Sequence, residues 1–364
     1  MGVLAAVLIL HLFFGLLIEN VKKKSLAALL GIAALIVILL FTAGISSNAD
    51  WKMYYYFFKL ENEKTDVMFV LLSKLFNTLG LAYKDLYVFH IVSIVGLFFV
   101  LSLKYTRNAF YVVLLYSMLD YVHLTNQIRY YFGFPIFMLG LYYLFSKKTY
   151  TVSVLLIILA LLFHKGLFIL LLFIPIFYLV PPGGFIRMML LLSVALTVLV
   201  VMVVRLGVGL SLEHFDSYLG REYEASVVGG LFNALPYLIY LAFILTEHYR
   251  MNRRYPDLLK DTKNVILMKL SFFPLLFLPA SFLLQIIGHR YIMPFSIFWV
   301  IFYLRLIRDL PARVRFLKML LFSGVHLAAL VSIYILPDFF FRENHYIEEI
   351  KVMLKSIPYL QNLL

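Results

Sequence analysis

The chain is built from long apolar segments that are separated by short groups of charged residues. A membrane-spanning helix needs roughly 20 apolar residues, and several of these segments hold only about 14 to 16. The pattern therefore predicts an all-α polytopic integral membrane protein with about 12 transmembrane helices, within a range of roughly 10 to 14. The segments expected to span lie near residues 3–19, 26–43, 86–103, 109–124, 128–145, 150–163, 166–180, 186–204, 229–246, 264–287, 291–304 and 317–336.

The composition excludes a water-soluble globular protein. Of the 364 residues, 63% are apolar and 14% are charged, and the mean hydropathy is +0.95. The spans leave no room for a separate soluble domain, so we expect residues 1–364 to form a single transmembrane domain. The first apolar segment has no basic residue before it and no cleavage pattern after it, which favours an uncleaved span over a signal peptide. Cysteine is absent, which excludes disulfides, zinc-thiolate sites and a cysteine nucleophile.

The positive charge is concentrated on every second connection between spans. If the loop with Lys22, Lys23 and Lys24 is cytoplasmic, the connections on its side carry 18 Lys or Arg and five acids. The opposite side carries 13 of each, so the whole formal charge of +13 lies on one face. This distribution follows the positive-inside rule, makes a nucleic-acid surface unnecessary and predicts that both termini face outward.

Two stretches do not fit simple spans, and both fall on the predicted outer side. Residues 45–85 form an outer loop that contains DVMFVLLSKLFNTL at 66–79, where polar residues follow one helical face. This pattern predicts an interfacial or re-entrant helix. Residues 205–228 form a second outer loop. The sequence shows no internal repeat, which weakens the transporter architectures that are built from two related halves.

Ionisable residues also collect at the outer ends of the spans, where each is a candidate site residue because charge is costly at membrane depth. Singly, each has a structural explanation. An arginine can snorkel, His164 can cap a helix hairpin, Asp120 can pair with His123 or Arg129, and aromatic residues near Tyr54 can form an interfacial belt. Lys269 is expected to snorkel as well. The group comprises Asp50, Asp120, His123, Arg129, His164, Lys165, His289 and Arg290.

Together these residues predict a polar outer cavity that binds anions. Guanidinium groups suit a diphosphate because their forked donors bind its oxygens in pairs. A nearby carboxylate or histidine can take a proton from a hydroxyl. The sequence lacks a glycine-rich phosphate loop, an HExxH zinc helix and a GxSxG nucleophile elbow. Nucleotide phosphates are not expected outside the cell, whereas lipid-linked diphospho-sugars are presented there.

Several motifs resemble those of EpsG-like, Wzy-type exopolysaccharide polymerases. The central segment NQIRYYFGFPIFMLGLYYLFSKKTYTVSVLLIILALLFHKGLFILLL is similar to the family signature, and Arg129, His164 and Lys165 fall on its positions. NADWKMYYYFF looks like the family's Asp-Tyr motif at Asp50 and Tyr54. TDVMFVLLSKLFNTLG resembles the Glu-Pro-Gly-Phe helix, with Asp66 in place of glutamate, and GHRYIMPF matches the late arginine motif at Arg290. The resemblance covers roughly residues 1–310, without the family's Pro-Gly or the arginine before Asp50.

The resemblance implies a GT-C-like membrane glycosyltransferase that needs no metal or cofactor. Such an enzyme joins polyprenyl-diphosphate-linked oligosaccharide repeats at the outer face of the bacterial inner membrane. It would contact membrane lipid and work with a chain-length regulator and a flippase. We predict Asp50, His164, Arg129 and Arg290 as catalytic, with Asp50 or His164 as the base. The substrate-binding set is Tyr54, Asp66, Asp120, Gln127, Lys165, Tyr218, Arg221 and His289.

Other classes of membrane protein stay open at this point. A flippase or transporter would need polar residues near the middle of its spans, where Lys269 and Gln285 are the main candidates. An acyltransferase that uses a cytoplasmic thioester would need its polar site on the inner side. A polysaccharide ligase differs from a polymerase in its acceptor, which the sequence does not reveal. A non-enzymatic scaffold would leave the outer arginines and histidines unexplained.

Overall fold

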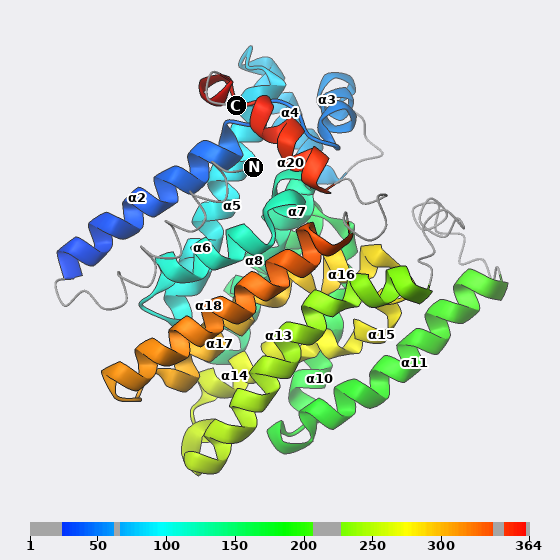
Figure 1. Cartoon of the computed structure of the whole chain (residues 1–364). Coiled ribbons are helices and arrows are strands. Elements are labelled where there is room, and N and C mark those ends of the chain that lie inside the picture. Colours follow the sequence, from blue (N-terminus) through cyan, green and yellow to red (C-terminus); the bar gives the residue numbers. More distant parts are fainter. Residues whose placement is uncertain (1–23, 62–65, 207–226, 338–345, 362–364) are drawn as a thin grey trace. The chain divides into compact units, whose positions relative to one another are not determined.

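The computed structural model describes residues 24–61, 66–206, 227–337 and 346–361, and this part of the chain is helical and contains no strand (Figure 1). Five of its helices are long and apolar enough to cross a membrane. They are Tyr83–Tyr105, Pro182–Met202, Val228–Arg254, Gln285–Ile307 and Ala312–Tyr334. The protein is therefore a polytopic helical membrane protein. Five shorter apolar helices accompany these, and the number of spans stays a prediction.

Contacts between residues divide the chain into two units. Unit 1 comprises residues 1–172, 310–323 and 342–364, and unit 2 comprises residues 173–309 and 324–341. Helix α18 (Ala312–Tyr334) contributes its first part to unit 1 and the rest to unit 2.

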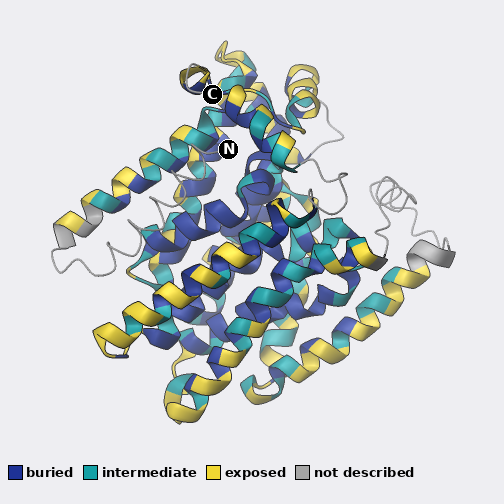
Figure 2. Ribbon diagram, in the orientation of Figure 1, coloured by how far each residue is buried: buried dark blue, intermediate teal, exposed yellow. Residues whose placement is uncertain are grey.

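Unit 1 is organised around helix α8, whose side chains are buried along almost its whole length (Figure 2). Helices α5 and α9 pack directly against it. A Cβ atom at Gly133 would lie 2.9 Å from the Ala160 carbonyl oxygen, and one at Gly140 would lie 2.8 Å from Ile157 Cγ1. The two glycines therefore let α8 and α9 approach closely. The elements of the unit are α2 (Lys24–Ala43), α3 (Trp51–Leu60), α4 (Val67–Thr78), α5 (Tyr83–Tyr105), α6 (Ala109–Leu119), α7 (Tyr121–Asn126), α8 (Ile128–Tyr142), the π-helical turn Tyr143–Lys147, α9 (Tyr150–Phe163), the 3₁₀ segment Lys165–Leu172, α20 (Tyr346–Lys355) and the 3₁₀ turn Pro358–Leu360.

Unit 2 holds a buried lysine that caps a helix. Lys269 is 3% exposed, and its ammonium donates to the carbonyl oxygens of Phe177 and Val180, each at 2.6 Å. The Lys269 side chain points inward to the end of α10, so the prediction that it snorkels to the membrane surface is wrong. The carbonyl oxygens at the end of a helix lack partners within the helix, and the lysine supplies them with a donor. The elements are α10 (Phe173–Leu179), the 3₁₀ turn Pro182–Gly184, α11 (Phe185–Leu206), α13 (Val227–Arg254), the 3₁₀ turn Pro256–Lys260, α14 (Thr262–Phe272), the 3₁₀ turn Phe273–Leu276, α15 (Leu278–Ser281), α16 (Gln285–Tyr291), the 3₁₀ turn Met293–Phe295, α17 (Ser296–Ile307) and the second part of α18.

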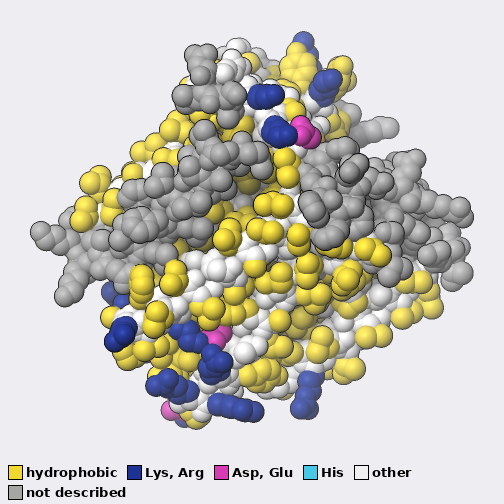
Figure 3. Space-filling model, in the orientation of Figure 1, with side chains coloured by type: hydrophobic (Ala, Val, Ile, Leu, Met, Phe, Trp, Pro, Cys, Tyr) yellow, Lys and Arg dark blue, Asp and Glu magenta, His cyan; other side chains and the backbone are white. Residues whose placement is uncertain are grey.

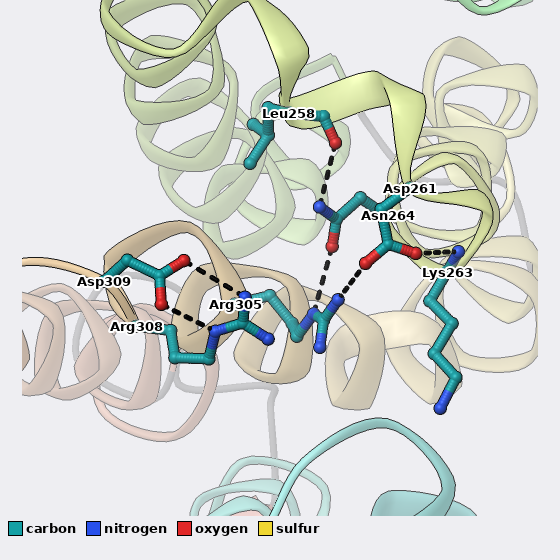
Figure 4. A network of polar contacts seen from close by, with 7 residues as sticks. All are labelled: Leu258, Asp261, Lys263, Asn264, Arg305, Arg308 and Asp309. Atoms are coloured by element: carbon teal, nitrogen blue, oxygen red, sulfur yellow. Dashed lines mark hydrogen bonds and ion pairs between the residues drawn. The ribbon is translucent and has the colours of Figure 1, made fainter.

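A polar network ties two predicted cytoplasmic connections of unit 2 together (Figure 4). Arg305, near the end of α17, donates to Asp261 at 2.6 Å and to Asn264 at 3.0 Å. Asp261 also caps α14 by accepting from the Lys263 backbone at 2.8 Å. The pairing joins residues 247–263 to residues 305–318, which the charge pattern places on the same side. The predicted alternation is therefore compatible with this contact.

The described surface is largely apolar, as expected of a protein in lipid. Figure 3 shows hydrophobic side chains over most of the described part of one face, with Lys and Arg in separate groups. Helix α11 carries a row of exposed large residues that includes Leu191, Val194 and Leu199 (Figure 2). Only 22% of the most apolar 18-residue stretch of this helix is buried, so most of the helix surface can contact lipid chains.

Candidate functional site

In unit 1, one buried carboxylate brings together polar residues that the sequence predicted at distant positions. Asp66 precedes α4, and its side chain is 6% exposed. Its Oδ2 atom accepts from Arg129 Nη1 at 2.7 Å and from His164 Nδ1 at 3.0 Å. Its Oδ1 atom accepts from the Lys165 backbone N–H at 3.1 Å. Three segments far apart in sequence therefore meet at Asp66, and we call this set the Asp66 cluster.

The close packing of α8 and α9 explains why Arg129 and His164 meet. Arg129 is the second residue of α8, and His164 directly follows α9 in extended conformation. The two helices run antiparallel through a short connection, so the start of one lies beside the end of the other. Because Gly133 allows α9 to approach α8 near this end, the two polar side chains can reach the same carboxylate.

Aromatic rings surround the Arg129 guanidinium. Its carbon lies 5.2 Å from the centroid of the Tyr54 ring, 5.6 Å from that of Phe57 and 5.8 Å from that of Phe69. Cation–π contacts of this kind hold a guanidinium in place while leaving its remaining N–H groups available for hydrogen bonds. Arg129 keeps 15% of its side chain exposed.

Opposing effects act on the pKa of Asp66, which lies outside the five long helices. Burial raises the pKa of this carboxyl, but the hydrogen bond and charge of His164, the charge of Arg129 and the Lys165 backbone N–H lower it by more. The net pKa is below the ordinary value of 3.8. Asp66 is therefore ionised at physiological pH and serves as the anchor of the cluster.

The structure places the other predicted residues of the first outer loop beside this cluster. Asp50 is partly exposed and close enough for its charge to act on Arg129. Tyr54 is buried on α3, where its ring contacts Phe69. Helix α4 occupies most of the stretch 66–79, where an interfacial or re-entrant helix was expected, and its placement at the membrane stays a prediction; α3 was not foreseen. The side chain of Lys165 is exposed.

Asp120 and Gln127 lie elsewhere in unit 1, at the two ends of the short helix α7. Asp120 is fully buried, and His123 Nδ1 lies 3.2 Å from its Oδ1 atom. The sequence left pairing of Asp120 with either His123 or Arg129 open, and the ion pair described for Asp120 is with His123. Gln127 is partly exposed and begins α8.

The remaining predicted residues lie outside unit 1 or outside the described residues. His289 and Arg290 are partly exposed on α16 of unit 2. Tyr218 and Arg221 fall within 207–226, outside the described residues, as does most of the predicted outer loop 205–228. The roles of these four residues stay predictions.

Two residues near these positions were absent from the predicted set. His90 on α5 is fully buried, its Nδ1 lies 2.8 Å from the Leu86 carbonyl oxygen, and its ring packs on Phe69 and Phe132. A histidine inside an apolar span was the available signal. Tyr346 on α20 lies against His123, with its hydroxyl 3.4 Å from Nε2. No sequence signal links Tyr346 to His123, because the two residues are 223 positions apart.

The side chains of the Asp66 cluster have the chemistry that binds an anion. A guanidinium with N–H groups beyond the one held by Asp66 is suited to the paired oxygens of a phosphate or diphosphate. Within the described residues, no group of three or more His, Asp or Glu side chains is arranged to hold a metal ion.

Comparison with known proteins places this chain in a family. No curated protein and no solved structure matches it. The match to the EpsG family extends over residues 28–347 and includes every residue of the Asp66 cluster. Since that match covers most of the 364 residues, the chain belongs to the EpsG family.

Proposed function

We propose that this protein is a membrane glycosyltransferase of the Wzy polymerase type. It joins polyprenyl-diphosphate-linked oligosaccharide repeat units at the outer face of the bacterial inner membrane. Membership of the EpsG family supports an exopolysaccharide polymerase-like activity. The observation that carries the proposal is the Asp66 cluster, in which a buried carboxylate and three aromatic rings fix one arginine at the start of α8.

In the proposed reaction, Arg129 binds the diphosphate of the donor lipid. A hydroxyl oxygen of the acceptor sugar attacks the anomeric carbon, a new C–O bond forms, and the bond from that carbon to the diphosphate oxygen breaks. The electron pair leaves with polyprenyl diphosphate, so negative charge on the diphosphate grows in the transition state. A preorganised guanidinium stabilises that state more than the ground state and therefore accelerates the step.

The finer details of the proposal follow from the family and from the chemistry of these side chains. Cations of the chain itself can stabilise the leaving diphosphate, so the enzyme is proposed to be of the GT-C class and to need no metal or cofactor. Arg290 is proposed as a second catalytic arginine, and the exposed Lys165 side chain is proposed to add positive charge near Arg129. A chain-length regulator and a flippase are the proposed partners.

The proposal is tested with purified protein in nanodiscs that is given polyprenyl-diphosphate repeat units without nucleotide sugar or metal. We expect a ladder of polymer on a gel, and we expect Arg129→Ala and Arg290→Ala to abolish it. Arg254→Ala is the matched control, because Arg254 also lies over an aromatic ring, that of Tyr255 at 5.7 Å, but is exposed at the end of α13.

Normal polymer length in both the Arg129 and Arg290 variants would overturn the assignment of the diphosphate site. A single product that forms only with an added acceptor would identify a ligase. Translocation of intact lipid in vesicles, without any product, would identify a flippase.

A further inference from the structure

Unit 1 contains a second Asp–His couple, which the proposed diphosphate site does not use. Asp120 lies at the junction of α6 and α7 and is fully buried, and His123 one turn later is 4% exposed. His123 Nδ1 lies 3.2 Å from Asp120 Oδ1. On the other side of the ring, the Tyr346 hydroxyl lies 3.4 Å from His123 Nε2. The three side chains thus form a continuous line from α6 through α7 to α20.

The order of these contacts defines how the couple handles protons. His123 Nδ1 lies 3.2 Å from a carboxylate oxygen of Asp120 without forming a hydrogen bond to it, and the charge of an ionised carboxylate favours the tautomer with the proton on that nitrogen. Nε2 is then the basic nitrogen, and it faces the Tyr346 hydroxyl, which can donate to it. A proton can therefore pass from the tyrosine hydroxyl to the imidazole while Asp120 stabilises the imidazolium that forms.

The two Asp–His couples of unit 1 differ in how their carboxylates are used. Asp66 shares its Oδ2 atom between His164 and Arg129, so much of its charge is already balanced by a permanent cation. The ion pair described for Asp120 is with His123. The Asp120 couple thus pairs a carboxylate with an imidazole, which is the arrangement used in general base catalysis. The Asp66 couple is better suited to bind an anion.

Helix α20 supplies the outer part of this second group and is fixed over α7. Glu349 of α20 accepts a hydrogen bond from the Asn126 amide, and Ser356 after α20 bonds with the backbone and side chain of Ser46. Ile350, Met353 and Leu354 bury the apolar face of the helix. Tyr346, at the start of α20, is partly exposed, whereas Asp120 and His123 are buried, so the tyrosine is the most exposed member of the line.

Unsatisfied acceptors beside the couple fit a hydroxyl-rich ligand. The Asn126 and Gln127 side-chain oxygens are buried and have no hydrogen-bond partner among the described residues. Such carbonyl oxygens can accept hydrogen bonds from water or from the hydroxyl groups of a sugar. Gln127 is also two residues from Arg129, so the segment that carries these acceptors continues directly into the Asp66 cluster.

We propose that Tyr346, His123 and Asp120 form the relay that takes the proton from the acceptor sugar hydroxyl. Tyr346 receives that proton as its own passes to His123 Nε2, while the hydroxyl oxygen bonds to the anomeric carbon and the diphosphate leaves with the electron pair. The proton on His123 returns to water through Tyr346 before the next turnover. This inference rests on the proposed glycosyl transfer and assigns the acceptor side of that reaction.

The test uses full-length protein in nanodiscs with fluorescent polyprenyl-diphosphate repeat units, and it measures lipid binding and the rate of transfer separately. We expect Tyr346→Phe to slow transfer at least about 10-fold and His123→Gln about 100-fold or more, in line with the contribution of general base catalysis. Lipid binding should stay as in wild type, because Arg129 is untouched. The controls are Tyr359→Phe, another C-terminal tyrosine, and His326→Gln, a buried histidine that contacts Tyr240 of unit 2.

A pH–rate profile separates a relay from a purely structural role. The titratable groups that face the couple are Tyr116 of α6, Tyr131 of α8, and Tyr346 and Glu349 of α20. If His123 takes the proton, the dependence of the transfer rate on pH should have a different shape in wild type and in His123→Gln. A structural defect would lower the rate without changing the shape of the profile.

Wild-type rates in both relay variants would overturn the inference while leaving the polymer ladder, and thus the proposed function, intact. A wild-type protein that neither binds the lipid nor forms a ladder would instead contradict the proposed function itself. If His123→Gln fails to fold, Tyr346→Phe decides the matter, because it removes one hydroxyl from a partly exposed residue.

Discussion

Replacing Asp66 with asparagine should destabilise unit 1 strongly although it barely changes the volume of the side chain. The substitution removes the charge that Arg129 and His164 both contact, at 2.7 and 3.0 Å, and leaves the guanidinium in a site where it is only 15% exposed. Breaking a buried ion pair on one side costs about 3–5 kcal/mol, since the other charge is left uncompensated. The lower end applies here because the rings around Arg129 retain its cation–π contacts, each of about 0.5–1 kcal/mol.

We therefore expect Asp66→Asn to lower the free energy of unfolding by about 3 kcal/mol, which is roughly a 100-fold change in the unfolding equilibrium. The assay is unfolding by SDS in mixed micelles, followed by circular dichroism. The matched control is Asp257→Asn, which breaks an exposed pair with Lys260 in which both side chains are more than three-quarters exposed, and should change stability by less than about 1 kcal/mol. Equal effects of the two substitutions would refute the reasoning.

Three further outcomes are expected. The pKa of Asp66 is lowered in the folded protein, so its stabilising contribution should be complete above the ordinary value of 3.8 and be lost as the pH falls through the lower folded value. The free energy of unfolding, measured from pH 7 to pH 3, should therefore decline only at the acidic end in wild type. The decline should be smaller in Asp66→Asn. Gly133→Ala should lower the melting temperature, since its Cβ atom would lie 2.9 Å from a backbone oxygen. Gly96→Ala is the control and should leave the melting temperature unchanged or raise it, since a Cβ atom there meets nothing within 4 Å. The same shift in both variants would contradict this packing argument. Lys269→Met should lower the free energy of unfolding by about 2 kcal/mol in the same assay, because it leaves two buried carbonyl oxygens without a donor. Lys260→Met on the surface is the control and should leave that free energy unchanged. An unchanged value for Lys269→Met would show that the cap is dispensable.

The apolar pattern predicted helices well wherever charged or turn-forming residues bound them. The expected span 150–163 is α9, Tyr150–Phe163, because Lys147 and Lys148 precede it and His164 ends it. The expected span 109–124 is interrupted at Asp120, where the backbone leaves the helical conformation. Hydrophobic periodicity does not report such a break, because the residues on both sides are apolar and buried.

Prolines account for a second difference. The expected span 264–287 is divided into α14, a 3₁₀ turn and the short helix α15. Pro274 and Pro279 lie at the start of the last two elements, where each removes a backbone donor and restricts the preceding residue. The two prolines are visible in the sequence and indicate these breaks, whereas apolar content alone does not.

The members of the candidate site were predictable, but their arrangement was not. Arg129, His164 and Lys165 stand out as polar residues at the ends of apolar segments, and Asp66 as the residue before an amphipathic helix. That Asp66 holds the others depends on contacts across 63 and 98 positions, which no local pattern encodes. The line from Asp120 to Tyr346 depends on an even longer separation.

The length of α9 has a consequence for the membrane around the Asp66 cluster. Its 14 residues rise about 21 Å, at about 1.5 Å per residue, whereas the hydrocarbon core of a bilayer is about 30 Å thick. If α9 spans the membrane, as the apolar pattern predicts, its end at His164 lies below the usual headgroup level unless the bilayer thins locally. Activity in nanodiscs should therefore depend on acyl-chain length, with shorter lipids bringing the donor diphosphate to the depth of Arg129. Bilayer thickness would then act as a physical regulator of polymer synthesis.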